Sequence, residues 1–313
     1  DGDTHPDECE TIFVDDDAAP GGDGLTWDSA LPHLQDGLAL ARSSRGVVEE
    51  IHVAQGVYRP DQGAGITPGD RDAAFKLVTE AAIRGGYAGI GSDDPDVRDV
   101  YAYRSTLSGD LAGDDVGISV TQNRDDNSHY VIYSILVATP VVLDGFTISG
   151  GGKAEPTPQS GRGGARISSN RPTILSCTFE NNGGTGLWTD SAFIANCIFR
   201  NNHGAYYGGG LYATGTSTIT NCLVVGCSAG SEGGGMYVTS QGSISNCTVY
   251  GNTTNGSVGA GIYASTLATV RNCIVRGNAA NGLRDQHAQI GYASTPSSPP
   301  FRHCYVENLA APT

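Results

Sequence analysis

The chain has 313 residues, of which 33 are acidic and 18 are basic, giving a formal net charge of -15 at pH 7. This charge argues against nucleic acid or an anionic membrane surface as a partner, because clustered Lys and Arg bind both. No apolar stretch reaches the ~20 residues of a spanning helix, so we expect no direct membrane insertion.

The start of the chain and its cysteines predict the compartment. The sequence begins at Asp1 with a polar, acidic run and no initiator Met, as a mature protein does after signal cleavage. It carries eight cysteines and only two lysines, Lys76 and Lys153. Together these features predict a secreted protein that is extracellular or at the cell surface.

Residues 27–41 predict a short amphipathic helix. Leu31, Leu34, Leu38 and Ala41 recur there at helical spacing. A solenoid needs its open end covered, and such a helix would serve as a cap. We therefore expect an N-terminal tail, strand and capping helix over residues 1–45, followed by a repeat domain over residues 46–313 with long loops in its first half.

Strands are predicted over residues 50–58, 75–85 and 105–110, and the loops between them are rich in Asp. Carboxylate oxygens suit Ca²⁺, although no stretch matches a twelve-residue calcium loop. Asp110, Asp114 and Asp115 are the first candidates for a Ca²⁺ site. Solvated acidic loops that require no cofactor are the favoured interpretation.

A repeat built on cysteine organises the second half of the chain. Cysteine stands at the same place in six successive segments: Cys177, Cys197, Cys222, Cys247, Cys273 and Cys304. Two residues after the cysteine comes Phe or Val, and three residues further comes a predicted turn Asn: Asn182, Asn202, Asn252 and Asn278. Cys227 takes the Asn place in one coil. Period-2 alternation places each cysteine and the following Phe or Val inside.

A second, Gly-rich block recurs in phase with the first. It reads Gly184 to Trp188, Gly208 to Tyr212, Gly233 to Tyr237 and Gly259 to Tyr263. A period of about 25 residues with several short β-branched strands and no helix predicts a parallel β-helix coil. The fold class is therefore all-β, a right-handed parallel β-helix solenoid with a short N-terminal capping helix.

Four aromatic residues of this block should point outward in one row, hereafter the aromatic row: Trp188, Tyr212, Tyr237 and Tyr263. Tyr206 and Tyr207 lie beside it. Such a row could stack on sugar rings or form a protein interface. A stabilising ladder between coils is the favoured interpretation.

The cysteines divide into two groups. The six in the repeat are predicted to be buried thiols, because parallel Cβ vectors make bridging between coils awkward. Cys9, in the polar tail, and Cys227, expected at a corner near the surface, are the candidates for a disulfide within one chain or between two chains.

The repeat resembles that of right-handed β-helix surface proteins of bacteria, and also the Gly-Gly-Ala-Ile and Phe-x-x-Asn repeats of chlamydial polymorphic outer-membrane proteins. The N-terminal motifs Ile12 to Asp15, Gly22 to Trp27, Ile51 to Pro60, Gly85 to Gly89 and Leu107 to Asp110 are similar as well. Many such surface proteins end in an anchoring or sorting domain, and no such segment was recognised here. The resemblance implies the fold strongly and the function weakly.

Two functions remain open after these observations. From residue 162 to residue 282 the acidic residues are only Glu180, Asp190 and Glu232, and no Asp cluster accompanies Arg166, Arg200, Arg271 or Arg276. This scarcity favours a non-catalytic extracellular structural or surface protein. The uncovered C-terminal edge adds the expectation that the protein self-assembles head to tail into filaments. The alternative is a carbohydrate-active enzyme of the polysaccharide lyase kind, or a glycan-binding adhesin, with a polysaccharide as partner.

Overall fold

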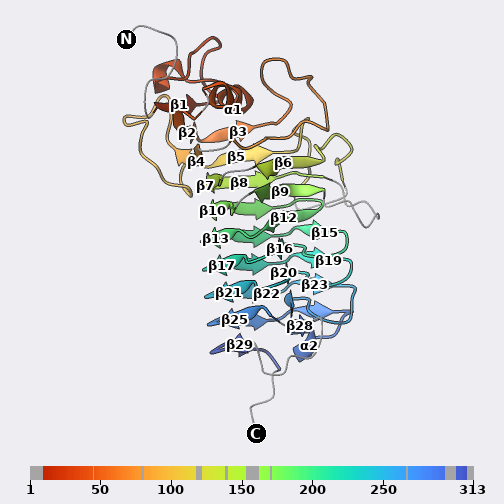
Figure 1. Cartoon of the computed structure of the whole chain (residues 1–313). Coiled ribbons are helices and arrows are strands. Elements are labelled where there is room, and N and C mark those ends of the chain that lie inside the picture. The colour runs from red at the N-terminus through yellow and green to blue at the C-terminus, as the bar shows by residue number, and fades with distance from the viewer. Residues whose placement is uncertain are drawn as a thin grey trace.

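The chain folds into a rod of stacked coils. The computed structural model describes residues 10–44, 46–78, 81–117, 122–137, 140–152, 162–169, 171–265, 267–292 and 301–308. Its strands lie one above another from the N-terminal to the C-terminal end of the rod (Figure 1). Among these residues all pairings between named strands are parallel, which confirms the all-β parallel β-helix.

Four parallel sheets run along the rod. Sheet A contains β1 (Glu10–Val14), β2 (Val48–Ala54), β4 (Ala82–Tyr87), β7 (Val142–Asp144), β10 (Thr173–Leu175), β13 (Phe193–Ala195), β17 (Thr218–Thr220), β21 (Ser243–Ser245), β25 (Thr269–Arg271) and β29 (Phe301–Arg302). Sheet B contains β3 (Gly56–Tyr58), β5 (Ser105–Ser108), β8 (Phe146–Ser149), β11 (Thr178–Glu180), β14 (Ile198–Arg200), β18 (Leu223–Val225), β22 (Thr248–Tyr250), β26 (Ile274–Arg276) and β30 (Tyr305–Val306).

The other two sheets complete the coils. Sheet C contains β6 (Tyr130–Val137), β9 (Gly163–Ser169), β12 (Thr185–Asp190), β16 (Leu211–Thr214), β20 (Met236–Val238), β24 (Ile262–Ala264) and β28 (Ile290–Tyr292). Sheet D contains β15 (His203–Gly204), β19 (Ser228–Ala229), β23 (Thr253–Thr254) and β27 (Ala279–Ala280). The helices within the described residues are η1 (Trp27–Ser29), α1 (Leu34–Ser43) and α2 (Gln286–Gln289).

The strands alternate between core and solvent as the sequence predicts. In β11 and β14, Phe179 and Phe199 are fully buried, and their rings stack at 5.0 Å with an interplanar angle of 6°. The residues between each cysteine and the buried Phe or Val, such as Leu223 and Ile274, face solvent. The apolar core is therefore one continuous column inside the rod, lined by sheets A, B and C.

The corners of the coils differ from the prediction. The left-handed backbone conformation falls on the residue before each cysteine, as in Asn196, Asn221 and Asn246, and on Asn181 and Asn201. Asn tolerates this conformation because its short side chain bonds locally. The predicted turn residues Asn182, Asn202, Asn252 and Asn278 lie one position later and are buried at 0–1% exposure.

These four buried residues, hereafter the amide row, hydrogen-bond from coil to coil. The Asn202 Oδ1 accepts from the Asn182 Nδ2 at 2.9 Å, and the Asn278 Oδ1 accepts from the Asn252 Nδ2 at 3.0 Å. At the C-terminal end of the row, the Gln289 Oε1 accepts from the Asn278 Nδ2 at 2.9 Å. The row thus satisfies polar groups that would be costly if buried alone.

Cys227 occupies the amide row between Asn202 and Asn252, and its side chain is fully buried. The prediction that it lies near the surface was wrong, because this position points into the core rather than out of the corner. Its thiol is free and lies 3.8 Å from the Asn202 Nδ2. A disulfide from Cys227 is therefore not supported; Cys9, the other candidate, lies outside the described residues.

The N-terminal end of the rod carries α1. This helix begins at Leu34, later than predicted, and buries Leu34, Leu38 and Ala41 against the core. Leu31 lies before it and pairs with Val14 at the outer edge of β1. That α1 serves as a cap, and that a domain boundary lies at residue 45, stay predictions.

The break in the amide row leads to a testable prediction. Cys227→Asn should restore an amide acceptor for the Asn202 Nδ2 and raise the free energy of unfolding by about 1 kcal/mol. The same position in neighbouring coils already holds Asn, so the side chain should fit. The check is the thermal unfolding midpoint, with Cys227→Ala as control, because it removes the thiol without adding an amide. Equal midpoints for both variants would contradict the prediction.

Candidate functional site

The aromatic row lies on sheet C, and its members pair in register. Trp188 is aligned with Tyr212, Tyr212 with Tyr237, and Tyr237 with Tyr263. The ring centroids are 5.8, 5.1 and 4.9 Å apart along the row, with interplanar angles of 7–8°. The predicted outward row is thus present as a stack of nearly parallel rings.

The stacking determines which parts of the rings are accessible. Each inner ring has a neighbour on both faces, so only ring edges and hydroxyl groups are directed away from the stack. At the N-terminal end of the row, the Arg166 guanidinium lies 4.5 Å from the Trp188 ring centroid, in a cation–π contact. Because a sugar stacks on a ring face, this arrangement favours the stabilising ladder over a sugar platform.

Tyr206 and Tyr207 belong to the same surface. The Tyr207 ring lies 4.7 Å from that of Tyr237 and 6.4 Å from that of Tyr206. Burial, followed by the charges of the neighbouring tyrosines, raises the pKa of Tyr237 to about 12. All six predicted aromatic residues therefore gather in one patch, and a ligand for that patch stays a prediction.

The Gly-rich block explains how the aromatic row and the amide row share one coil. A Cβ on Gly235 would lie 2.6 Å from the Gly261 carbonyl oxygen and 3.0 Å from the Asn252 Nδ2. Only glycine lets the backbone approach the next coil and the buried amide this closely. The repeated Gly is thus a packing requirement of the amide row.

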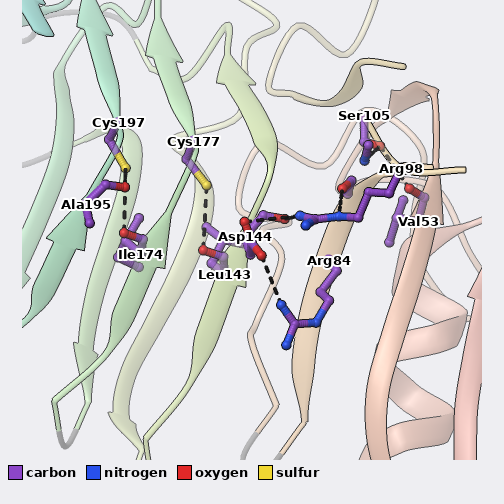
Figure 2. Close-up of polar contacts among 12 residues, drawn as sticks. Val53, Arg84, Arg98, Ser105, Leu143, Asp144, Ile174, Cys177, Ala195 and Cys197 are labelled. Carbon is purple, nitrogen blue, oxygen red and sulfur yellow. Dashed lines mark hydrogen bonds and ion pairs between the residues drawn. The ribbon is translucent and has the colours of Figure 1, made fainter. Parts of the chain in front are cut away.

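A second polar group lies on the outer face of sheet A, and the sequence did not reveal it. Figure 2 shows the Asp144 carboxylate between two guanidinium groups, with the Arg84 Nη1 at 2.9 Å and the Arg98 Nη2 at 3.1 Å. The Arg84 Nε also donates to Glu50 at 2.8 Å. These residues come from three coils before residue 162 and from a long loop, and no sequence period links them.

The chemistry of this charged group argues against its use as a base. Burial lowers the pKa of Arg84, but the hydrogen bond and charge of Glu50 and the charge of Asp144 outweigh it, so the pKa is raised. A guanidinium that holds its proton more firmly is a poorer proton acceptor. Arg98 also donates to the Gly85 carbonyl oxygen at 2.9 Å, which fixes its loop on the sheet.

Beside this charged group lies a small second core. The Trp27 ring contacts Phe13 and Tyr87 at 4.9 and 5.8 Å, and the Trp27 Nε1 donates to the Asp96 carboxylate at 2.8 Å. His52 stacks on Tyr87 at 4.2 Å. These contacts hold η1 and the loop after β4 against sheet A, so this second core has a structural role.

The acidic residues of the repeats are separated, as the sequence predicts. Glu180 forms ion pairs with Arg104 at 2.8 Å and with Arg200 on sheet B. Asp190, on sheet C, accepts from the Thr214 hydroxyl at 2.8 Å. These carboxylates therefore stand on different faces rather than together as an acid and a base.

An open pocket of about 520 Å³ lies at the N-terminal end of sheet B. Its polar lining comes from Asp16, Asp17, Gln55, Arg104 and Thr106. Its volume falls within the range of small-molecule sites, and its mixture of carboxylate, amide and guanidinium can bind several hydroxyl groups. No sequence pattern predicts this pocket, because its residues lie on separate coils and loops.

The structure brings together only two of the three predicted calcium ligands. Asp110 and Asp114 place their carboxylate oxygens within 4.8 Å of those of Asp126, whereas Asp115 forms an ion pair with buried Arg124 at 3.3 Å. The Asp110 carboxylate also accepts three backbone N–H groups of its own loop. Burial raises the pKa of Asp115 to about 6. Ca²⁺ binding at this loop stays a prediction.

The seven described cysteines are free thiols, and those of the repeat line the core as the sequence predicts. In Figure 2 the Cys177 and Cys197 thiols each donate to a backbone carbonyl of the neighbouring coil, those of Leu143 and Ile174. Among the described residues, no helix has the length and apolarity that crossing a membrane requires.

Residues 138–291 match a family model described as a right handed beta helix region. No curated protein and no solved structure matches the chain. The match and the parallel sheets together show the parallel β-helix fold. Membership of the anchored bacterial surface proteins stays a prediction.

The stacking of the aromatic row predicts unequal effects for two matched substitutions. Tyr237 contacts three rings, whereas Tyr263 contacts one. At roughly 0.5–1.5 kcal/mol per pair, Tyr237→Leu should lower the free energy of unfolding by about 1–3 kcal/mol more than Tyr263→Leu. Chemical unfolding of both variants measures the difference. Equal losses would show that the stack contributes nothing beyond burial.

Proposed function

We propose that this β-helix is a non-catalytic structural or surface protein that acts outside the cell. One observation carries the proposal: the most prominent outward feature, the aromatic row, uses its ring faces for contacts between its own coils. The charged side chains on sheets A and B described above are paired in the same way, Asp144 with two arginines and Glu180 with two others. These contacts join neighbouring coils and stabilise the rod.

The composition supports the compartment in this proposal. A net charge of -15 favours solubility and repels polyanions, and only two of the 18 basic residues are lysines. The free thiols of the repeat are almost all buried, which shields them from oxidants outside the cell. Secretion and surface location follow as part of the proposal.

The alternative function, a glycan-binding adhesin or carbohydrate-active enzyme, has one observation in its favour. The pocket at the N-terminal end of sheet B offers carboxylate, amide and guanidinium groups to a sugar. It has no described aromatic ring in its lining, so binding would rest on hydrogen bonds alone. We therefore place this function second.

The two functions separate in one set of assays. We expect no release of unsaturated products from acidic polysaccharides and no binding on a glycan array, because the inner ring faces of the aromatic row and the charged groups of sheets A and B described above are already engaged. Unsaturated product would overturn the structural proposal. Binding without turnover would favour an adhesin, and loss of that binding in Arg104→Ala but not in Arg271→Ala would assign it to the pocket.

Head-to-tail self-association is a further part of this proposal. Among the described residues, β28, β29 and β30 are the last strands of sheets C, A and B, and each pairs on one side only. At the other end, backbone groups of Phe13 and Asp15 in and after β1 already bond to the segment Gly24–Leu31. A junction would thus join the strand edge of one copy to the covered end of the next.

Self-association should depend on the C-terminal coil. We expect oligomers that grow with protein concentration in light scattering and end-to-end rods in negative-stain microscopy. Tyr305→Lys, on the exposed face of β30, should weaken them by adding charge at the edge. Tyr250→Lys, the matched change on a central coil, should leave them intact. Monomers alone at high concentration would count against assembly.

A further inference from the structure

The cysteines of the repeat form a row along the core side of the corner between sheets A and B: Cys177, Cys197, Cys222, Cys247, Cys273 and Cys304. Backbone pairing keeps this cysteine row in register. The amide after each cysteine donates to the carbonyl oxygen of the cysteine one coil earlier, as from Thr248 to Cys222 and from Tyr305 to Cys273, both at 2.9 Å. Neighbouring cysteines are therefore one strand spacing apart, ~4.8 Å.

Each sulfur atom lies beside the cysteine of the coil before it. The Cys222 backbone N lies 3.5 Å from the Cys247 Sγ, and the Cys273 backbone N lies 3.5 Å from the Cys304 Sγ. The hydrogen bond with the thiol of the preceding coil, together with burial, raises the pKa of Cys222 and Cys247 to about 12 and that of Cys273 to about 11. These three thiols are thus protonated at neutral pH.

Access to the row is restricted to its C-terminal end. The five cysteines from Cys177 to Cys273 are 0–3% exposed, whereas Cys304 is partly exposed on the last described coil. A solute can therefore reach Cys304 first and Cys273 directly behind it. No other adjacent pair in the row has an accessible member.

We propose that Cys273 and Cys304 bind a thiophilic metal cation that takes two ligands in a line. A metal–thiolate bond is about 2.3 Å long, so a linear sulfur–metal–sulfur bridge spans about 4.6 Å, which matches the spacing of the coils. Thiolates select soft cations, and a linear bridge needs no third ligand from this apolar corner.

The binding step balances in atoms and charge. Two S–H bonds break, two metal–sulfur bonds form, and two protons pass to solvent. With a divalent cation the product is neutral, so the core gains no uncompensated charge. Zinc is a poor fit because it takes four ligands, and no third Cys, His, Asp or Glu joins this pair among the groups found in the described residues.

Mercuric chloride alone is a suitable probe of this pair. The full chain with Cys9→Ser, which removes the one thiol outside the described residues, should take up one equivalent under native conditions. Native mass spectrometry should show the mass of one mercury atom less two protons. The thermal midpoint should rise, because the bridge ties the last coil to the coil before it. Zinc chloride should produce neither change.

Two variants locate the bridge. Cys304→Ala should reduce the proton loss from two to one and abolish the rise in midpoint. Cys177→Ala, at the buried far end of the row, should bind as the parent does. If Cys304→Ala does not fold, alkylation of the unfolded parent followed by peptide mapping gives the same information, because Cys273 and Cys304 alone should be protected.

Three results would overturn the proposal. The first is no mercury uptake by the folded parent protein. The second is a two-proton loss that persists in Cys304→Ala, or protection of a different pair of cysteines, because the bridge would then lie elsewhere. The third is a fall in the thermal midpoint on binding, which would mean that the metal disrupts the coil.

Discussion

In-register pairing of parallel strands is the constraint on which the rest of this structure depends. Each coil lies one strand spacing from the next, so a side chain meets the residue at the same position of the neighbouring coil. A residue type that recurs at one position of the repeat therefore forms a row along the rod. The buried amides, the cysteines and the aromatic rings are three such rows, and each stabilises the rod only because the register does not slip.

This constraint also explains which features the sequence could predict. Cys222 and the outward Tyr237 belong to positions that repeat about every 25 residues. At a repeated position, strand alternation determines whether the side chain points into the core or toward solvent. The stacked cores and the outward rings were therefore predicted correctly. The corner was predicted one residue too late, because Asn201 and Asn202 are both Asn and their types do not distinguish the left-handed residue from the buried one. In later coils Gly251 and Gly277 take the left-handed conformation, and these glycines are the signal that could have placed the corner.

The parts that the sequence could not predict share a different property. Arg84, Arg98 and Asp144 come together because long loops return to sheet A, and no period links their positions. The pocket with Arg104 and Asp17 arises in the same way. Gln289 was missed because it completes the amide row from a short helix instead of from the Asn position of the repeat.

The amide row has a direction, and that direction bears on how the rod could grow. In each described bond between two side-chain amides of the row, the donor lies in the earlier coil and the acceptor lies on the C-terminal side. The last Asn therefore needs an acceptor beyond itself, and Gln289 supplies it. A coil duplicated between Asn182 and Asn278 would bring its own acceptor and leave this terminus unchanged. The number of internal coils can thus vary, whereas a rod of any length needs α2, because Gln289 of this helix accepts the hydrogen bond of the last Asn.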